Sequence, residues 1–239
     1  FGNTAFHIKP DDVSEITRSI KWVGFTSGGD FRKWAGNLHF VVNWLNSGLE
    51  IKSGHNPIVP NEHLYFQEAI TWSKISSSSP SFRRHPAGLI PGDAGPFAII
   101  KDGWYENVFA SLNAAHTLQF LKILSPTLNF QVGDVGNVPI LQLDSAAVNV
   151  KRLVSISEFD WNAYERSWGF QSFPFLRKSA ELFATVQSSY NDWINQIHKI
   201  VAEMKFLEEE NNRLFINAYG LADELAPEVP IEQITLTFN

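Results

Sequence analysis

Apolar residues recur at alternating intervals of three and four positions over the last quarter of the chain, and no other pattern in the sequence restricts the fold as strongly. The repeat consists of Phe183, Val186, Tyr190, Trp193, Ile197, Ile200, Met204 and Leu207, continued by Asn211, Leu214, Ala218 and Leu221. Gly220 stands where the C-terminal cap of a helix belongs. The pattern predicts one helix of about 40 residues with a coiled-coil-like apolar seam.

One helix cannot bury such a seam alone, so the seam needs a partner. The preceding helical segment, another chain and a further part of a longer parent polypeptide are all compatible partners. A long helix packed on its own domain also shows such a repeat, which leaves ordinary globular packing as an alternative to a coiled coil. Asn211 at a seam position would cost stability but could fix the register of the pairing.

The first hundred residues show short apolar or alternating runs at 22–25, 39–44, 69–72 and 97–100. These runs are rich in β-branched and aromatic residues and are bounded by Gly, Pro, Ser and Asn, a combination that predicts strands of an irregular sheet. The serine tract from Ser76 to Ser79, closed by Pro80, predicts an exposed loop.

Helical spacing over residues 105–124 predicts one helix, ended by Ser125-Pro126. Residues 128–132 alternate as a strand does, Gly133-Asp134 predicts a turn, and Asp144 could cap a helix that runs to about Ser157. The predicted fold class is therefore α+β. An irregular, mainly-β domain with one packed helix spans residues 1–143, and an α-helical region with the long coiled-coil-like helix spans residues 144–239.

Charge is distributed unevenly along the chain. Residues 1–90 hold nine Lys/Arg against seven Asp/Glu, a balance of +2, whereas residues 151–239 hold eight against thirteen, a balance of −5. Because acidic surfaces repel phosphates, any DNA would be bound by the first part. The absence of cysteine excludes disulfides and thiolate metal sites, and the chain has neither a long apolar run nor a secretory signal. We expect a soluble, cytoplasmic protein without membrane contact.

Several catalytic motifs are missing. No G-x-G turn is present for S-adenosylmethionine, and Asn56-Pro57-Ile58-Val59 lacks the second proline and the aromatic residue of the tetrapeptide that holds a flipped base. Asp30 with Glu50-Ile51-Lys52 loosely matches a nuclease metal site, but Glu50 to Lys52 is equally well a strand end after the turn Asn46-Ser47-Gly48. We expect no catalytic, cofactor-binding or metal-binding residues here. Since the chain begins at Phe1 without methionine, we also expect it to derive from a longer polypeptide that carries the missing chemistry.

Three clusters suit contact with nucleic acid. In residues 28–37, glycines allow close backbone approach, Arg32 and Lys33 can contact phosphates, and Trp34 offers a flat surface beside Asn37. A core tryptophan beside a solvated turn is the alternative. The second cluster runs from Ile70 to His85, and Asn129 with Gln131 forms the third, on one face of a predicted strand; capping and packing are common fates of such amides. The second cluster contributes Trp72, Ser73, Lys74, Ser77, Ser78, Arg83 and Arg84.

The order of these segments resembles the C-terminal half of the adenine-specific DNA methyltransferases of the phage growth limitation and BREX phage-defence systems. The matching stretches, which span nearly the whole chain, are residues 28–37, 70–77, 93–96, 124–134, 160–168, 219–221 and 223–225. The run from Thr127 to Asp134 is the most specific of them. Leu89-Ile90-Pro91-Gly92 interrupts an apolar strand that the resemblance leads us to expect.

The resemblance implies a target-recognition region like the specificity subunits of restriction-modification systems. Its partners would be double-stranded DNA and the N-terminal methyltransferase domain of the parent, and S-adenosylmethionine would bind to that domain. We hypothesise that Arg32, Lys33 and Lys74 contact phosphates, and that Arg83 and Arg84 contact base edges. Ser73, the serine loop, Asn129 and Gln131 would add base contacts. The alternative is a protein-interaction module that binds a partner, or a second copy, through the heptad helix and never contacts DNA.

Overall fold

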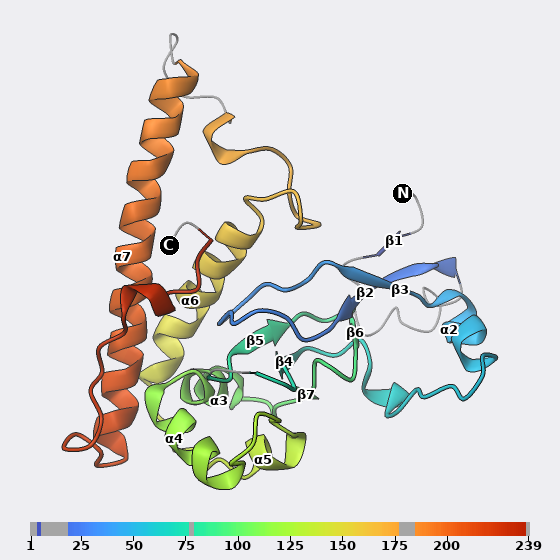
Figure 1. Ribbon diagram of the computed structural model, residues 1–239, viewed down its shortest axis with the longest axis horizontal. Coiled ribbons are helices and arrows are strands. Elements are labelled where there is room, and N and C mark those ends of the chain that lie inside the picture. The colour runs from blue at the N-terminus through green and yellow to red at the C-terminus, as the bar shows by residue number, and fades with distance from the viewer. Residues whose placement is uncertain (1–3, 6–18, 77–78, 177–184, 238–239) are drawn as a thin grey trace.

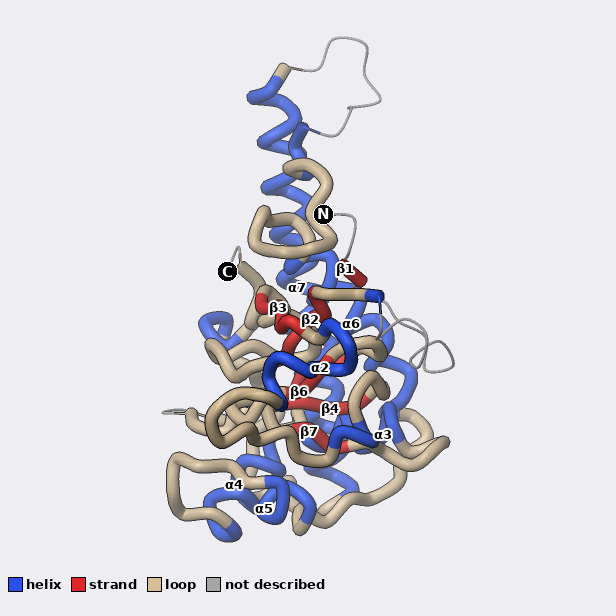
Figure 2. Tube along the Cα trace, turned by 90° about the vertical axis from the view of Figure 1, so that its right-hand side faces the viewer, coloured by secondary structure: helices blue, strands red, loops and turns tan. Residues whose placement is uncertain are grey.

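The computed structural model describes residues 4–5, 19–76, 79–176 and 185–237. In these residues, two small sheets occupy one side of the molecule, and the long helices α6 (Ala146–Trp161) and α7 (Val186–Ala218) run side by side on the other (Figure 1). Short helices pack below them, and the N-terminal end of α7 projects beyond the rest (Figure 2). The predicted α+β class is confirmed.

The first sheet is centred on β2 (Trp22–Thr26). The strand β3 (Phe40–Asn43) pairs with β2 antiparallel, with Phe25 opposite Phe40, while β1 (Thr4–Ala5) and β6 (Ile90–Pro91) pair with it parallel. The second sheet has the order β5 (Phe82–His85), β4 (Ala69–Trp72), β7 (Phe97–Ala98). All four residues of β4 are buried, as expected for a central strand made of apolar residues and threonine.

The structure confirms strands in all four predicted runs and adds three others, β1, β5 and β6. The expected interruption at Leu89 to Gly92 contains β6, and residues 82–85 of the second predicted cluster form β5. Asn46, Ser47 and Gly48 do turn the chain, with φ values of 51°, 57° and 74°. They lie in the first part of the helix α2 (Leu45–Lys52), so Glu50 to Lys52 is helical and is not a strand end. The 3₁₀ helix η2 (Glu62–Leu64) follows.

The prediction of one helix over residues 105–124 is wrong, because α3 (Tyr105–Leu112) and α4 (Ala115–Leu124) are separate helices. Side chains of α7 occupy the break: Asn211 Nδ2 donates to Ala110 O in the last turn of α3, and Asn212 Oδ1 accepts from Ala115 N at the start of α4. Such partners replace the hydrogen bonds that helix ends lack. The expected end of α4 at Ser125 is confirmed.

The segment after α4 also differs from the prediction. Only Asn129 pairs as in a strand, opposite Ile75, and the expected turn at Gly133-Asp134 is the short helix α5 (Val132–Gly136). The following helix, α6, begins after Ser145 rather than Asp144 and continues to Trp161. The chain then passes through η3 (Pro174–Leu176) before it reaches α7, and η4 (Ile231–Gln233) lies near its end.

Both ends of α7 show capping. Thr185 accepts a hydrogen bond from Ser188 N, and Gly220 has a left-handed φ of 68°, with Leu221 N donating to Ile216 O at 2.9 Å. This is the Schellman arrangement that the glycine predicts. The helix has 33 residues, fewer than expected, and Phe183 of the predicted seam lies outside the described residues.

The seam of α7 packs within the chain, against α6, α4, α3 and η3. Trp193, Ile197, Met204 and Asn211 are buried as predicted. At two other seam positions the buried residue is the next one along the chain. Glu208 is buried instead of Leu207, and Phe215 instead of Leu214. A straight helix has 3.6 residues per turn, so a seven-residue repeat drifts around its surface unless the helix supercoils. The packing is therefore that of an ordinary globular helix on the preceding helices.

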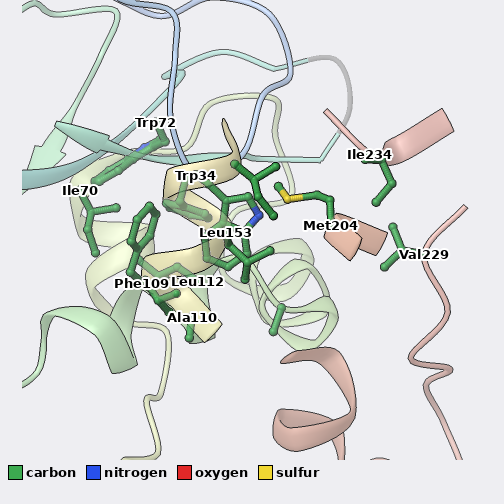
Figure 3. Packing of buried hydrophobic residues seen from close by; sticks show 14 of the residues in the cluster. Trp34, Ile70, Trp72, Phe109, Ala110, Leu112, Leu153, Met204, Val229 and Ile234 are labelled. Carbon is green, nitrogen blue, oxygen red and sulfur yellow. The ribbon is translucent and has the colours of Figure 1, made fainter. Parts of the chain in front are cut away.

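One hydrophobic cluster crosses the predicted domain boundary at residues 143 and 144. It joins Trp34, Ile70 and Phe109 to Leu153, Met204 and Ile234 (Figure 3). A second, smaller cluster lies around Trp44 near the first sheet. Within the part of the chain that the structure describes, no helix combines the length and apolar character needed to cross a bilayer.

Candidate nucleic-acid interface

A cleft of about 510 Å³ opens where the turns after β2, β4 and β6 meet. Gly28 and Gly29 follow β2, residues 73–75 follow β4, and Asp93 and Ala94 follow β6, while His39 and Phe40 close the remaining side. Because β2 and β6 run parallel, their carboxyl ends lie at the same edge of the sheet. The structure thus brings parts of the first two predicted clusters together.

The glycines of the first cluster are required by packing. A Cβ on Gly28 would lie 2.8 Å from Ala94 O, and Gly29 has a φ of 140° with Asn37 Nδ2 only 2.7 Å from the position of its Cβ. Asn37 is buried, and its Nδ2 donates to Asp30 O at 3.0 Å. These residues hold the wall of the cleft in place. No contact with a ligand is needed to explain them.

The other residues of the first cluster face the helices. Arg32 is buried and its Nη2 donates to Asp160 Oδ2 of α6 at 2.7 Å. Lys33 Nζ and Trp34 Nε1 both donate to the buried carboxylate of Glu208 in α7, each at 2.8 Å. The structure therefore assigns Arg32, Lys33 and Trp34 to joining the first part of the chain to α6 and α7. The residues 27–37 cross between these parts in Figure 1.

The second cluster is split between core and rim. Trp72 is buried and donates from Nε1 to Phe130 O at 2.8 Å, and Ser73 donates to Gly29 O at 2.9 Å from the cleft wall. Lys74 reaches the rim, where its Nζ lies 2.9 Å from both carboxylate oxygens of Asp93. Ser77 and Ser78 lie outside the described residues.

Arg83 and Arg84 belong to the strand β5, so their side chains take opposite directions. Arg83 is 1% exposed and donates to Arg32 O and to Ser73 Oγ at 3.4 and 3.3 Å. Its burial, with Arg32 nearby, lowers the pKa of Arg83 to about 10. Arg84 instead pairs with Glu68 at 2.7 Å and Glu158 at 3.0 Å.

The structure does not bring four of the cations of the first two clusters together at one surface. Arg32 points to α6, Lys33 to α7, Arg83 into the interior and Arg84 to a different groove, so these four cations do not line a common concave surface. The sequence shows that cations lie near turns, but it does not show which carboxylates pair with them. Asp160 and Glu208 are 128 and 175 positions away from their partners.

The third cluster lies beside the rim of the cleft. Asn129 and Gln131 are both exposed, but they do not share a strand face, because Gln131 precedes α5 and its backbone N–H donates to Asp134 Oδ2. Asn129 is opposite Ile75, and the hydrogen bonds from Ser76 N to Leu128 O and from Phe130 N to Lys74 O join the two segments. Lys74, Ile75 and Asn129 therefore form one exposed edge.

The sequence analysis missed Asp93 and Ile75 as candidate site residues. Asp93 is 91% exposed in its side chain and Ile75 is 67% exposed. Asp93 could have been found from the turn formers Pro91 and Gly92, which mark the end of a strand that we expected to be interrupted at Leu89 to Gly92. For Ile75, its position between Lys74 and the serine tract, outside the apolar alternation of β4, was the available signal.

The cleft carries a small negative charge. Lys74 supplies one positive charge and Asp30 and Asp93 two negative ones. His39 adds none at neutral pH, since burial and the neighbouring Arg166 lower its pKa, although Asp30 raises it. A site of this charge suits the polar edges of bases better than phosphates.

The loose nuclease pattern is separated in space. Asp30 follows the C-terminal end of β2. Glu50 and Lys52 lie in α2, which is at the opposite end of β2, because α2 follows Asn43 and Asn43 pairs with Trp22. Lys52 pairs with Glu62 and Glu50 accepts from Asn43. Among the residues that the structure describes, no three His, Asp or Glu side chains are placed to hold a metal ion.

Two bacterial proteins align with almost the whole chain. The chain is 37% identical over 229 residues to the adenine-specific methyltransferase PglX of Lacticaseibacillus casei (strain Zhang), an alignment that covers 90% of this chain and 19% of that protein. It is homologous to one segment of the PglX/BrxX adenine-specific methyltransferases. Identity to BrxX of Escherichia coli O9:H4 (strain HS) is 30% over 223 residues, covering 92% of this chain and 18% of that protein.

These alignments confirm the resemblance to the PglX/BrxX methyltransferases that the sequence motifs indicated. The chain spans about a fifth of the length of these relatives. No family model matches it.

Proposed function

We propose that this chain selects the DNA site of an adenine-specific methyltransferase and carries none of the methyl-transfer chemistry. Homology to one segment of PglX and BrxX supports a role within such an enzyme. The convergence of two segments that are distant in the sequence at one exposed edge supports a role in recognition. That edge presents Lys74, Ile75 and Asn129, whose cation, apolar surface and amide can contact guanine, the thymine methyl group and adenine respectively.

The proposal uses only part of the predicted set of DNA-contacting residues. Lys74, Asn129 and Gln131 are at the surface. Asn129 and Gln131 keep their expected base contacts, whereas Lys74, which we expected to contact a phosphate, is now assigned to a base edge. Arg32, Lys33, Trp34, Asn37, Trp72, Ser73 and Arg83 support the edge from within, since each has an internal hydrogen-bond partner. Arg84 is partly exposed but lies in the groove on the other side of β5, next to Val150 and Val154 of α6.

The described residues do not fit S-adenosylmethionine. Gly28 and Gly29 follow a strand, but the next regular element is the strand β3, so no helix N-terminus faces the glycine turn. We place the cofactor and the transfer step in another part of the parent enzyme. Double-stranded DNA and that catalytic part are the proposed partners, and a DNA substrate implies a protein of the bacterial cytoplasm.

The test is a gel-shift titration of the parent polypeptide, at low salt, with its own methylated motif and a scrambled duplex. We expect Lys74→Ala to weaken binding to the motif by about 1 to 3 kcal/mol, the usual loss for one base contact. Lys52→Ala is the matched control, because it also breaks an exposed ion pair but lies in α2, at the opposite end of β2. Equal binding of motif and scrambled duplex by the unaltered protein would refute the proposal.

A protein-interaction module is the second candidate, and one observation favours it. The N-terminal end of α7 projects from the body (Figure 2). Val186 and Tyr190 of the predicted seam belong to this end of the helix and are 67% and 45% exposed. A partner helix could cover them. Replacing both residues with serine would then abolish association with that partner and leave DNA binding unchanged, measured by sedimentation velocity and gel shift.

A further inference from the structure

Lys74 and Asp93 form an ion pair that differs from the two pairs at Arg32 and Lys33. The carboxylates of those two pairs are almost fully buried, and both pairs join segments of the core. The Asp93 side chain is 91% exposed, and that of Lys74 is 28% exposed at the rim of the cleft. Exposed ion pairs contribute little to stability. This pair therefore contributes little to the stability of the fold.

Backbone hydrogen bonds hold the pair in a fixed place. Lys74 N donates to Ala94 O at 3.1 Å, next to Asp93, and Lys74 O accepts from Phe130 N at 2.8 Å. The turn that carries Asp93 is tightly packed, because a Cβ on Gly95 would lie 3.0 Å from the backbone of Ser27. The structure thus presents a donor, Lys74 Nζ, and acceptors, the Asp93 oxygens, 2.9 Å apart at an open rim.

A G·C base pair presents the complementary arrangement in the major groove. Guanine O6 is an acceptor and cytosine N4 a donor, and since they hydrogen-bond to each other they lie about 2.9 Å apart. We infer that the intact Lys74–Asp93 pair contacts one G·C pair of the target sequence, with Lys74 facing guanine and Asp93 facing cytosine. The inference rests on the proposed function, and it makes Asp93 a specificity-determining residue.

The same geometry disfavours the other base pairs. A T·A pair with thymine facing Lys74 would lose one contact, because thymine has a C5-methyl group where guanine has the acceptor N7. On the other side of that pair, the acceptor N7 of adenine would face the carboxylate of Asp93. The two reversed orientations would put an amino group against the ammonium of Lys74. The negative charge of the cleft has a related effect, because Asp93 repels phosphates and so weakens binding that is independent of sequence.

The experiment selects bound sequences from a 30-bp duplex library with a randomised centre, using the parent polypeptide and its Asp93→Asn variant. We expect the unaltered protein to select a motif with a G·C pair at one position that becomes degenerate in the variant, with a loss of discrimination there of about tenfold. Affinity for a scrambled duplex should increase in the variant. Asp102→Asn, at an exposed carboxylate outside the cleft, is the control and should change neither result.

The outcomes separate the inference from the proposed function. Absence of any selected motif with the unaltered protein would refute the proposed function. A clear motif that Asp93→Asn leaves unchanged, or weakens equally at every position, would refute the role of the ion pair and leave site recognition intact. Because Asp93 is exposed, its substitution is not expected to affect folding, which circular dichroism of the variant checks.

Discussion

At the residue scale, several charged and polar side chains are buried with partners that lie far away in the sequence. Glu208 is the clearest example, since one carboxylate in the middle of α7 accepts from both Lys33 and Trp34. Asp160 has the same function in α6, where it accepts from Arg32 and from the amide of Thr237. These carboxylates explain why cations that resemble a DNA-binding turn in the sequence lie inside the molecule.

Replacing Glu208 with alanine should destabilise the protein by about 3 kcal/mol, because the partly buried Lys33 ammonium would lose its counter-charge and the buried Trp34 Nε1 its acceptor. Urea unfolding followed by tryptophan fluorescence measures the change. The control is Glu203→Ala on the same helix, which breaks an exposed pair with Arg152 and should cost no more than about 1 kcal/mol. Equal effects of the two substitutions would show that the Glu208 contacts do not stabilise the fold.

The buried His85 predicts a pH dependence of stability. Its Nδ1 lies 3.0 Å from Thr26 Oγ1 between the two sheets, and burial lowers the pKa of His85 to about 4. In the unfolded chain the pKa of histidine is about 6.5, so between these values only the unfolded state binds the proton. Stability is therefore complete above pH 6.5 and decreases as the pH falls toward 4.

The loss over that window should be about 3 kcal/mol for His85, and the pKa of His116, also lowered to about 4 by burial, adds a second contribution. The measurement is urea unfolding at pH 7, 5.5 and 4.5. His85→Asn keeps a polar atom near the position of Nδ1 and should flatten the curve, whereas His198→Asn at an exposed site of α7 should not. A slope that His85→Asn leaves unchanged would contradict the prediction.

At the element scale, α7 organises the helices around it. Its central side chains contact α6, and Asn211 and Asn212 fit the break between α3 and α4. Asn211 of the predicted seam donates to Ala110 O, and its role in fixing the register stays a prediction. The partner is the end of a short helix, which the sequence analysis did not foresee.

Replacing Asn212 with leucine should destabilise the protein by about 1 to 3 kcal/mol, because the partly buried Ala115 N and Pro227 O would each lose a hydrogen bond. Thermal or urea unfolding gives the value. Asn195→Leu, at an exposed position of the same helix, should stay within about 0.5 kcal/mol of the unaltered protein. If both variants were equally stable, the hydrogen bonds at the break would have no structural importance.

At the scale of the whole molecule, the first part of the chain and the helices share one core. Trp34 and Phe109 pack in the same cluster as Met204 and Phe215, and the last described residues return to it through Val229, Ile234 and Leu236. Thr235 Oγ1 accepts from Lys33 N, so even the C-terminal segment contacts the residues that precede β3. The predicted division at residues 143 and 144 runs through this packing.

We therefore expect residues 1–143 expressed alone to lack cooperative unfolding, because Arg32 and Trp34 would lose Asp160 and Glu208 and the core would be open. Residues 1–143 and 144–239 produced together should recover a cooperative transition in urea. A cooperative transition of the first fragment alone, at the stability of the intact chain, would show that the division is a true domain boundary.

The proposed recognition edge depends on residue types, on the pairing of two segments and on the topology of the first sheet. Residue types predicted Lys74 as a phosphate contact and Asn129 as a base contact, since cations pair with phosphates and amides with base edges. Their placement side by side depends on the pairing of Ile75 with Asn129, two residues 54 positions apart in the sequence (129 − 75). Asp93 joins them only because β6 pairs with β2 and brings its turn to the same rim.

The sequence by itself determined the features that depend on local periodicity and capping. These are the strands at residues 22–25 and 69–72, the long helix, its glycine cap at Gly220 and the end of α4 at Ser125. Only the tertiary structure decided the break between α3 and α4, the burial of Arg32 and Arg83, and the partner of the α7 seam. The reason is physical. A helical period or a cap is written within a few residues, whereas the partner that satisfies a buried charge or a helix end comes from a segment more than a hundred positions away, as Asp160 does for Arg32.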